Sequence, residues 1–220
     1  MLVNPNTTAS MTRGIEASAR AAASPATIVE ATNPTSGPAS IENDDDERRC
    51  VPNLLVEFTR AASRPQDRPD AYVIACFGDP GLDQARALVD GPVLGIAQAA
   101  MHAAALSAGD FSVVTSMSAT VPRAWELAKT YASGQCLGVY AGDIPVLTID
   151  SDPATVHPIG DLCERALAQD GSHAIVLGCA AMARFAAPLT RRLGVPVVDG
   201  VVAATLLAET LVRLGRITAR

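Results

Sequence analysis

The sequence contains a single lysine, few aromatic side chains and no long apolar run. Because Lys129 is the only lysine among 17 basic residues, a pyridoxal cofactor bound through lysine would have to use it. The net charge of -6 disfavours binding to nucleic acid or to an anionic membrane. No apolar run approaches the roughly 20 residues that a membrane span needs, and the N-terminus lacks a basic segment followed by an apolar one. We therefore expect a cytoplasmic protein without nucleic-acid or membrane partners.

Disulfide and metal frameworks are also missing. The five cysteines are odd in number and widely spaced, and the three histidines are scattered. No CxxC pair and no clustered Cys/His spacing occurs, so a disulfide scaffold or a structural zinc site does not follow. No phosphate-binding GxxxxGK[ST] or GxGxxG loop occurs either. We expect free thiols, no metal and no cofactor.

The pattern of apolar residues favours an α/β fold. The 220 residues are 49% hydrophobic, enough to bury a large core. Short β-branched runs alternate with Ala/Leu/Arg-rich segments of helical length, which is typical of a parallel sheet with crossover helices. The expected strands include "ATIVEA", "AYVIA", "FSVVT", "AIVLG" and "VPVVD"; the expected helices include "SMTRGIEASARAAA" and "VVAATLLAETLVRLG".

An internal repeat divides the chain. "AYVIACFGDPG", residues 71–81, and "HAIVLGCAAM", residues 173–182, each end an apolar run with a cysteine followed by small residues. At nearly equal distances beyond the two cysteines come "PVLGIAQAA" and "PVVDGVVAA". A weaker match pairs "LVNPNTT" near the N-terminus with "VVTSMSA" near residue 113. Repeats of this kind indicate two copies of one α/β unit.

We expect two pseudo-symmetric lobes, each a parallel sheet flanked by helices, with an active site in the cleft between them. Residues 1–95 form the first lobe, completed by a C-terminal helix over 201–220, and residues 96–200 form the second. Ligands of parallel sheets bind at the carboxyl ends of the strands, so Cys76 and Cys179 should face one ligand from opposite sides. Backbone N–H groups and helix N-termini there should lower the pKa of both thiols.

Two opposed thiols are suited to inverting a carbon stereocentre. One thiolate removes a proton from one face and the opposite thiol returns a proton to the other face. Backbone N–H groups of the turns after each cysteine could stabilise the intermediate carbanion as an enolate.

Six motifs together resemble the aspartate/glutamate racemase superfamily and, within it, the hydantoin and allantoin racemase branch. In chain order they are "VNPNTT", "GPASIE", "ACFGDPG", "FSVVTS", "VLGCAAM" and "PVVDGVVAA". The resemblance implies a cofactor-independent racemase with Cys76 and Cys179 as the acid/base pair. It also implies a small-molecule substrate, and we expect a homo-oligomer. Substrate contacts carried over to matching positions come from the side chains of Asn6, Thr115 and Ser116 and from the backbone of Gly78, Ala180 and Ala181.

The expected substrate class follows from the absence of an arginine or lysine that could bind a substrate carboxylate. A free amino acid carries a carboxylate that usually pairs with arginine or lysine, and the loops directly after the cysteines contain neither. A 5-substituted hydantoin or allantoin is neutral and needs only amide-type hydrogen bonds. Racemisation of aspartate- or glutamate-type amino acids, arylmalonate-type decarboxylation and maleate-type isomerisation remain alternatives on the same scaffold. A non-catalytic two-lobed binding module is a further alternative, but it gives no reason for matched thiols.

Overall fold

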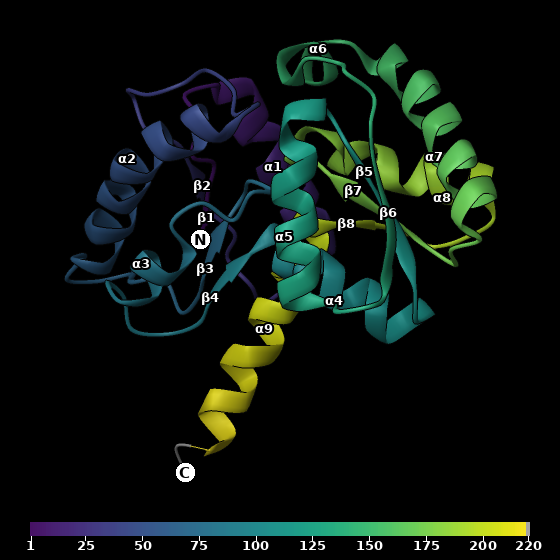
Figure 1. Cartoon of the computed structure of the whole chain (residues 1–220). Coiled ribbons are helices and arrows are strands. Elements are labelled where there is room, and N and C mark those ends of the chain that lie inside the picture. Colours follow the sequence, from purple (N-terminus) through teal and green to yellow (C-terminus); the bar gives the residue numbers. More distant parts are fainter. Residues whose placement is uncertain (219–220) are drawn as a thin grey trace.

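Two parallel four-stranded sheets form the framework of the protein (Figure 1). The computed structural model describes the backbone of residues 1–218 and the side chains of residues 1–215. The first sheet has the order β2-β1-β3-β4 and the second has the order β6-β5-β7-β8. The strands are β1 (Leu2–Val3), β2 (Ala31–Thr32), β3 (Tyr72–Ile74), β4 (Val93–Gly95), β5 (Phe111–Thr115), β6 (Cys136–Ala141), β7 (Ile175–Gly178) and β8 (Val197–Asp199).

The repeat in the sequence corresponds to a repeat in topology. Replacing each strand of the first sheet by the strand four later in the chain gives the order of the second sheet. The strands β3 and β7, which precede Cys76 and Cys179, are therefore equivalent interior strands. This equivalence confirms the predicted α/β fold with two similar sheets.

Helices cover the sheets and connect successive parallel strands. They are α1 (Ala9–Ala22), α2 (Asp44–Ala62), α3 (Leu82–Arg86), α4 (Ile96–Ala108), α5 (Val121–Tyr131), α6 (Val146–Ser151), α7 (Val156–Asp170), α8 (Ala186–Leu193) and α9 (Gly200–Thr218). Short 3₁₀ turns are η1 (Ser118–Thr120), η2 (Pro153–Thr155) and η3 (Ala180–Phe185). In α1, Met11, Ile15 and Ala19 recur every four residues and are buried, as expected of an amphipathic helix.

Small side chains let helices from both halves pack closely at the centre. Helix α9 contacts α1 and α4, and the shared core there is rich in alanine, including Ala99 and Ala204. A Cβ added to Gly200 would lie 2.5 Å from the carbonyl oxygen of Ile96, so the first turns of α9 and α4 touch through backbone. Beyond this contact α9 extends away from the body of the molecule (Figure 1).

Some predicted boundaries were wrong. "ATIVEA", residues 26–31, was expected to be a strand, but only its last residue belongs to β2. Strand β6 was not predicted. Its sequence "CLGVYA" contains one glycine and one tyrosine, which interrupt the run of aliphatic residues. Among the described residues, no helix is long and apolar enough to cross a membrane. The lobe boundaries at residues 95 and 200 stay a prediction, and residues 219–220 of the expected C-terminal helix lie outside the described residues.

Candidate active site

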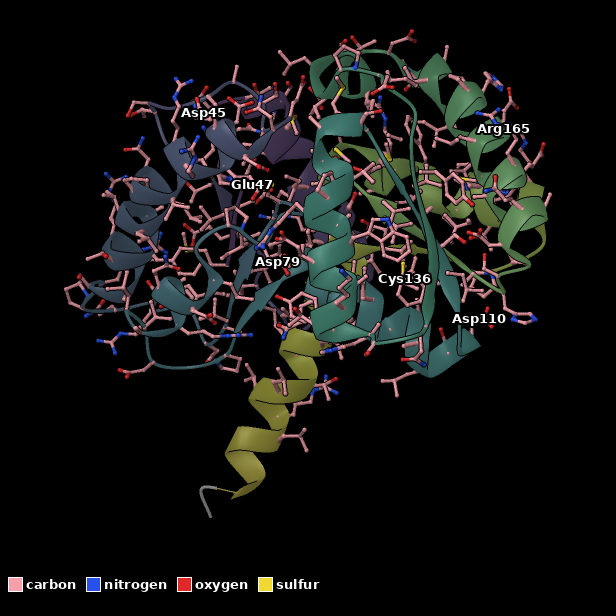
Figure 2. The ribbon with its side chains drawn as sticks, viewed as in Figure 1. Asp45, Glu47, Asp79, Asp110, Cys136 and Arg165 are labelled. Atoms are coloured by element: carbon pink, nitrogen blue, oxygen red, sulfur yellow. The ribbon has the colours of Figure 1, made fainter. Side chains whose placement is uncertain are left out.

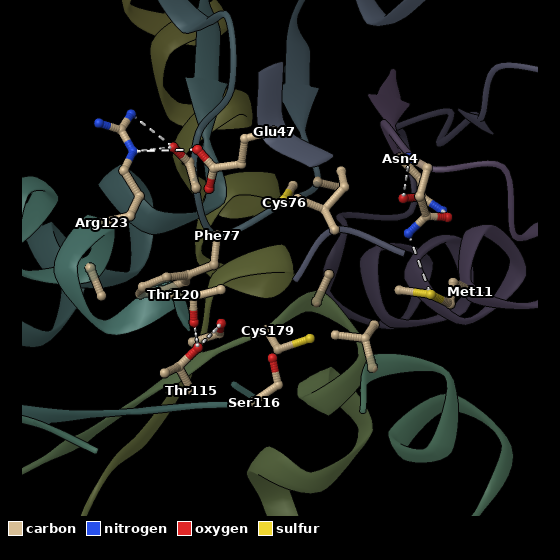
Figure 3. A pocket seen from close by; sticks show the side chains of 18 residues that line it. Asn4, Met11, Glu47, Cys76, Phe77, Thr115, Ser116, Thr120, Arg123 and Cys179 are labelled. Carbon is tan, nitrogen blue, oxygen red and sulfur yellow. Dashed lines mark hydrogen bonds and ion pairs between the residues drawn. The ribbon is translucent and has the colours of Figure 1, made fainter. Parts of the chain in front are cut away.

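A cavity lies at the carboxyl ends of the central strands, between residues of the two halves (Figure 3). Cys76 enters it from the turn after β3, and Cys179 enters it from the turn after β7. The remaining lining residues are Asn4, Asn6, Met11, Ile41, Glu47, Ala75, Phe77, Gly78, Thr115, Ser116, Thr120, Arg123, Ala124, Val146, Gly178 and Ala180. All predicted site residues except Ala181 thus line this cavity. The backbone N–H of Ala181 acts on the Cys179 thiol.

The Cys76 turn is fixed by the side chain of Asp79. This buried aspartate has φ of 47°, a conformation that aspartate tolerates better than most residues. Its two carboxylate oxygens accept hydrogen bonds from the N–H groups of Ala97 (3.0 Å) and Gln98 (2.9 Å) at the start of α4. A Cβ at Gly95 would lie 2.1 Å from the Asp79 carboxyl carbon, so the glycine makes room for this cap. The turn is thereby tied to the neighbouring strand and helix.

The Cys179 turn supplies hydrogen-bond donors to its thiol. The donors are the backbone N–H groups of Ala181 and Met182 and the hydroxyl of Ser116. Figure 3 shows the Cys179 sulfur beside Ser116. Thr115 holds the strand end itself, because its hydroxyl donates to the carbonyl of Gly178 at 3.1 Å. These contacts favour a negative charge on Cys179 over one on the opposite thiol.

Both thiols have a raised pKa, which corrects the expectation of lowered values. Burial raises the pKa of Cys179 to about 11 even though the N–H of Ala181 and the hydroxyl of Ser116 act to lower it. Burial, and after it the charge of Glu47, raises the pKa of Cys76 well above its ordinary value. The free energy needed to remove a thiolate from water is larger than the stabilisation that a few N–H groups provide. Both groups are therefore predominantly thiols at neutral pH, and Cys179 is the easier one to ionise.

Asn6 is oriented as a donor rather than an acceptor. Its side-chain oxygen accepts hydrogen bonds from Asn4 Nδ2 and from the Thr8 N–H, both at 2.9 Å. Its amide nitrogen lies 3.4 Å from the Met11 sulfur, and a thioether is a weak acceptor. The amide N–H of Asn6 is thus the part of this side chain best able to bind a carbonyl oxygen of a ligand.

The hydroxyl of Thr115 makes hydrogen bonds within the protein at the end of β5. Its hydroxyl is shared between Gly178 and the hydroxyl of Thr120 at 2.9 Å. Although Thr115 lines the cavity, its hydrogen bonds maintain the strand end and the η1 turn. The hydroxyl of Ser116 acts to lower the pKa of the Cys179 thiol. The predicted substrate contacts of these two hydroxyl groups stay predictions.

Two charged residues that line the cavity, Glu47 and Arg123, were not predicted from the sequence. Arg123 on α5 donates to the carbonyl of Gly78 from Nε at 3.1 Å and from Nη2 at 3.0 Å. Its Nε lies 3.7 Å from the Glu47 carboxylate on α2. A signal for Glu47 existed, because it lies three residues before Cys50 and seven before Leu54, and both of those are buried on one face of α2.

The rest of the wall is largely apolar. Met11, Ile41, Phe77, Ala124 and Val146 line it, which suits a small molecule with a hydrophobic substituent. Within the described part of the chain, no group of three or more His, Cys, Asp or Glu side chains is arranged to hold a metal ion.

Comparisons with known proteins place these features in a family. The model of the Asp/Glu/Hydantoin racemase family matches residues 1–208. A hydantoin racemase from Rhizobium meliloti is 44% identical over all of this chain and 90% of that protein. One from Pseudomonas sp. (strain NS671) is 41% identical over all of this chain and 88% of that protein.

Solved structures agree with the sequence comparison. Allantoin racemase from Klebsiella pneumoniae has a TM-score of 0.93 and 44% identity, and the match covers 97% of this chain and 87% of that one. Arylmalonate decarboxylase, with a TM-score of 0.62 and 17% identity over 96% of this chain and 91% of that one, shares the fold alone. The chain belongs to the Asp/Glu/Hydantoin racemase family.

Proposed function

We propose that this protein racemises 5-substituted hydantoins or allantoin by two-base proton transfer between Cys76 and Cys179. One observation carries the proposal: the two halves of the repeat each contribute a thiol to the same cavity. The full-length similarity to hydantoin racemases and the high structural similarity to allantoin racemases support the substrate class.

The reaction begins at Cys179, whose thiolate has the better hydrogen-bond donors. It takes the proton from C5 of the ring, and the electron pair of that C–H bond moves into the adjacent carbonyl to give an enolate. Cys76 then donates its thiol proton to the opposite face of C5, which forms the new C–H bond. The opposite enantiomer reacts in the reverse direction and restores the first protonation state.

Stabilisation of the enolate is assigned to N–H donors. Asn6 lines the cavity, and its amide N–H has the weak acceptor Met11 as its partner within the protein. A donor fixed in this way strengthens its hydrogen bond as negative charge develops on the carbonyl oxygen. The raised pKa of each thiol also makes its thiolate a stronger base towards a carbon acid.

The charge of the cavity favours a neutral substrate. Among the residues that the structure describes, the cation lining the cavity is Arg123, which is occupied by the Gly78 carbonyl, Glu47 and Glu126. An amino acid or a diacid would therefore bring a carboxylate without a partner. A decarboxylase would need one working cysteine, whereas this cavity has two. A cytoplasmic location and a homo-oligomeric state remain predictions from the sequence.

The test is a substrate panel followed by circular dichroism. We expect decay of the optical signal of both enantiomers of an alkyl hydantoin or of allantoin, at a rate above that of enzyme-free buffer. Aspartate, glutamate, maleate and an arylmalonate should be unchanged. Turnover of a carboxylate substrate with no effect on any hydantoin or on allantoin would overturn the proposal.

A further inference from the structure

Glu47 lines the cavity, and its carboxylate packs over Gly78, two residues after Cys76. Glu47 belongs to the first part of α2, where its neighbours Asp45 and Asp46 are exposed or half-buried. Its own side chain is only 17% exposed, whereas that of Asp45 is 62% exposed. In Figure 2, Glu47 lies on the part of α2 that faces α5, and Asp45 lies at the outer edge.

The contacts of this carboxylate leave it able to accept a hydrogen bond. Within residues 1–215, its charged partner is Arg123 at 3.7 Å, a distance beyond that of a hydrogen bond. Its Oε1 atom packs over Gly78, where an added Cβ would lie 1.9 Å from it. The Gly78 carbonyl, and not Glu47, takes the two short hydrogen bonds of the guanidinium.

Burial raises the pKa of the Glu47 carboxyl, and the charge of Arg123 opposes that shift. A half-paired carboxylate inside a cavity is costly unless an N–H or O–H group completes its shell. An anionic ligand cannot do so, because it brings further negative charge. A ligand with an N–H group can.

The position of Glu47 selects one N–H group of the ligand. Its Oε1 atom packs over Gly78, so the carboxylate lies against the turn that carries Cys76, the thiol proposed to face the reacting carbon. In a hydantoin the nitrogen closest to that carbon is N1, which is bonded to C5.

We propose that Glu47 is a specificity-determining residue that accepts a hydrogen bond from the substrate N–H attached to the reacting carbon. Arg123 positions the Cys76 turn through its hydrogen bonds to the Gly78 carbonyl, and its charge attracts the Glu47 carboxylate. The same carboxylate disfavours substrates that carry a negative charge near this nitrogen. This inference rests on the proposed racemase function and names the group that recognises the ureide.

The experiment compares 5-benzylhydantoin with its N1-methyl and N3-methyl derivatives. The wild type should lose roughly 10- to 100-fold in kcat/KM on N1-methylation, the range of one hydrogen bond to a charged group, and less on N3-methylation. Glu47→Ala should lose a similar factor on the parent compound and show almost no further loss on N1-methylation. Glu47→Gln, which keeps one acceptor oxygen, should recover part of the activity.

The matched control is Glu126→Gln, which removes the other carboxylate paired with Arg123 at an exposed position. It should keep the wild-type preference for the parent compound. Far-UV circular dichroism and the alkylation rate of Cys179 verify that each variant is folded. If Glu47→Ala still rejects the N1-methyl compound as strongly as the wild type does, the inference is wrong. If the wild type racemises no hydantoin and no allantoin, the proposed function itself fails.

Discussion

Individual hydrogen-bond donors decide how readily each thiol ionises. Cys179 receives two backbone N–H groups and the Ser116 hydroxyl, whereas for Cys76 the N–H of Gly78 opposes both burial and the nearby charge of Glu47. The two thiols are therefore chemically unequal although the repeat makes them topologically equivalent. Such inequality suits a pair in which one member must be charged while the other keeps its proton.

Removing the Ser116 hydroxyl should make Cys179 harder to ionise. In Ser116→Ala the pKa of Cys179 should rise above its value of about 11, and iodoacetamide should alkylate this thiol roughly tenfold more slowly at pH 8. For both proteins the rate should increase as the pH rises towards that pKa, because only the thiolate reacts.

Ser107→Ala is the control, because that exposed hydroxyl bonds only within α4. Mass spectrometry resolves the labelling of each cysteine. An unchanged rate at Cys179 in Ser116→Ala would show that the hydroxyl does not support its thiolate.

At the scale of elements, carboxylates at helix starts tie the strand ends together. Asp79 caps α4 from the Cys76 turn, and Asp199 at the end of β8 caps α9 through the N–H groups of Val201 and Val202. An N-cap of this kind is worth about 0.5–2 kcal/mol. The capped helices α4 and α9 follow equivalent strands, β4 and β8, but the two aspartates come from different positions, the turn after β3 and the end of β8.

Asp79 should make stability fall as the pH rises from about 4 to 7. Burial raises its pKa from 3.8 to about 7, although the N–H groups that it caps act to lower it. Between these values the unfolded chain releases the proton more readily than the folded one, and folding is disfavoured. In Asp79→Asn, which tolerates the same backbone conformation, this part of the pH dependence should vanish.

Urea unfolding at a series of pH values measures the difference. The comparison with wild type cancels the contributions of the other carboxyl groups. Parallel curves for the two proteins over this pH range would contradict the assignment.

At the scale of the whole molecule, the packing of α4 against α9 sets the spacing of the cleft. Both helices start directly after edge strands, β4 and β8, of the two sheets. Their alanine-rich core and the backbone contact at Gly200 allow a close approach. Helix α9 also contacts β3, and both helices contact β7, so this packing supports the strands that precede the two thiols.

Enlarging Gly200 should therefore affect stability and catalysis together. Gly200→Ala places a methyl group 2.5 Å from the Ile96 carbonyl, and overpacking of this kind costs about 1–3 kcal/mol of unfolding free energy. Because the helices must separate, kcat should also fall. Gly215→Ala, in the same helix with nothing within 4 Å of its added methyl group, should change neither by a comparable amount. Equal stability and kcat in the two variants would contradict this prediction.

The repeat made much of this architecture predictable from the sequence, since matched motifs imply matched strands and opposed turns. Three features of the site could not be predicted from the repeat. Glu47 lies in the run "NDDDERR", whose other acidic residues are exposed or half-buried. Arg123 reaches the cavity only through a contact between α5 and the Cys76 turn. The raised pKa of both thiols depends on burial, which local motifs do not reveal.

Exchange of the C5 proton in deuterated buffer tests whether Cys76 and Cys179 act on opposite faces of the substrate. Each enantiomer of an alkyl hydantoin is followed separately by NMR with wild type, Cys76→Ser and Cys179→Ser, and enzyme-free buffer gives the background. We predict that neither variant racemises the substrate and that each variant exchanges only one enantiomer, a different one for each. Exchange of both enantiomers by either variant, or of the same one by both, would contradict this prediction.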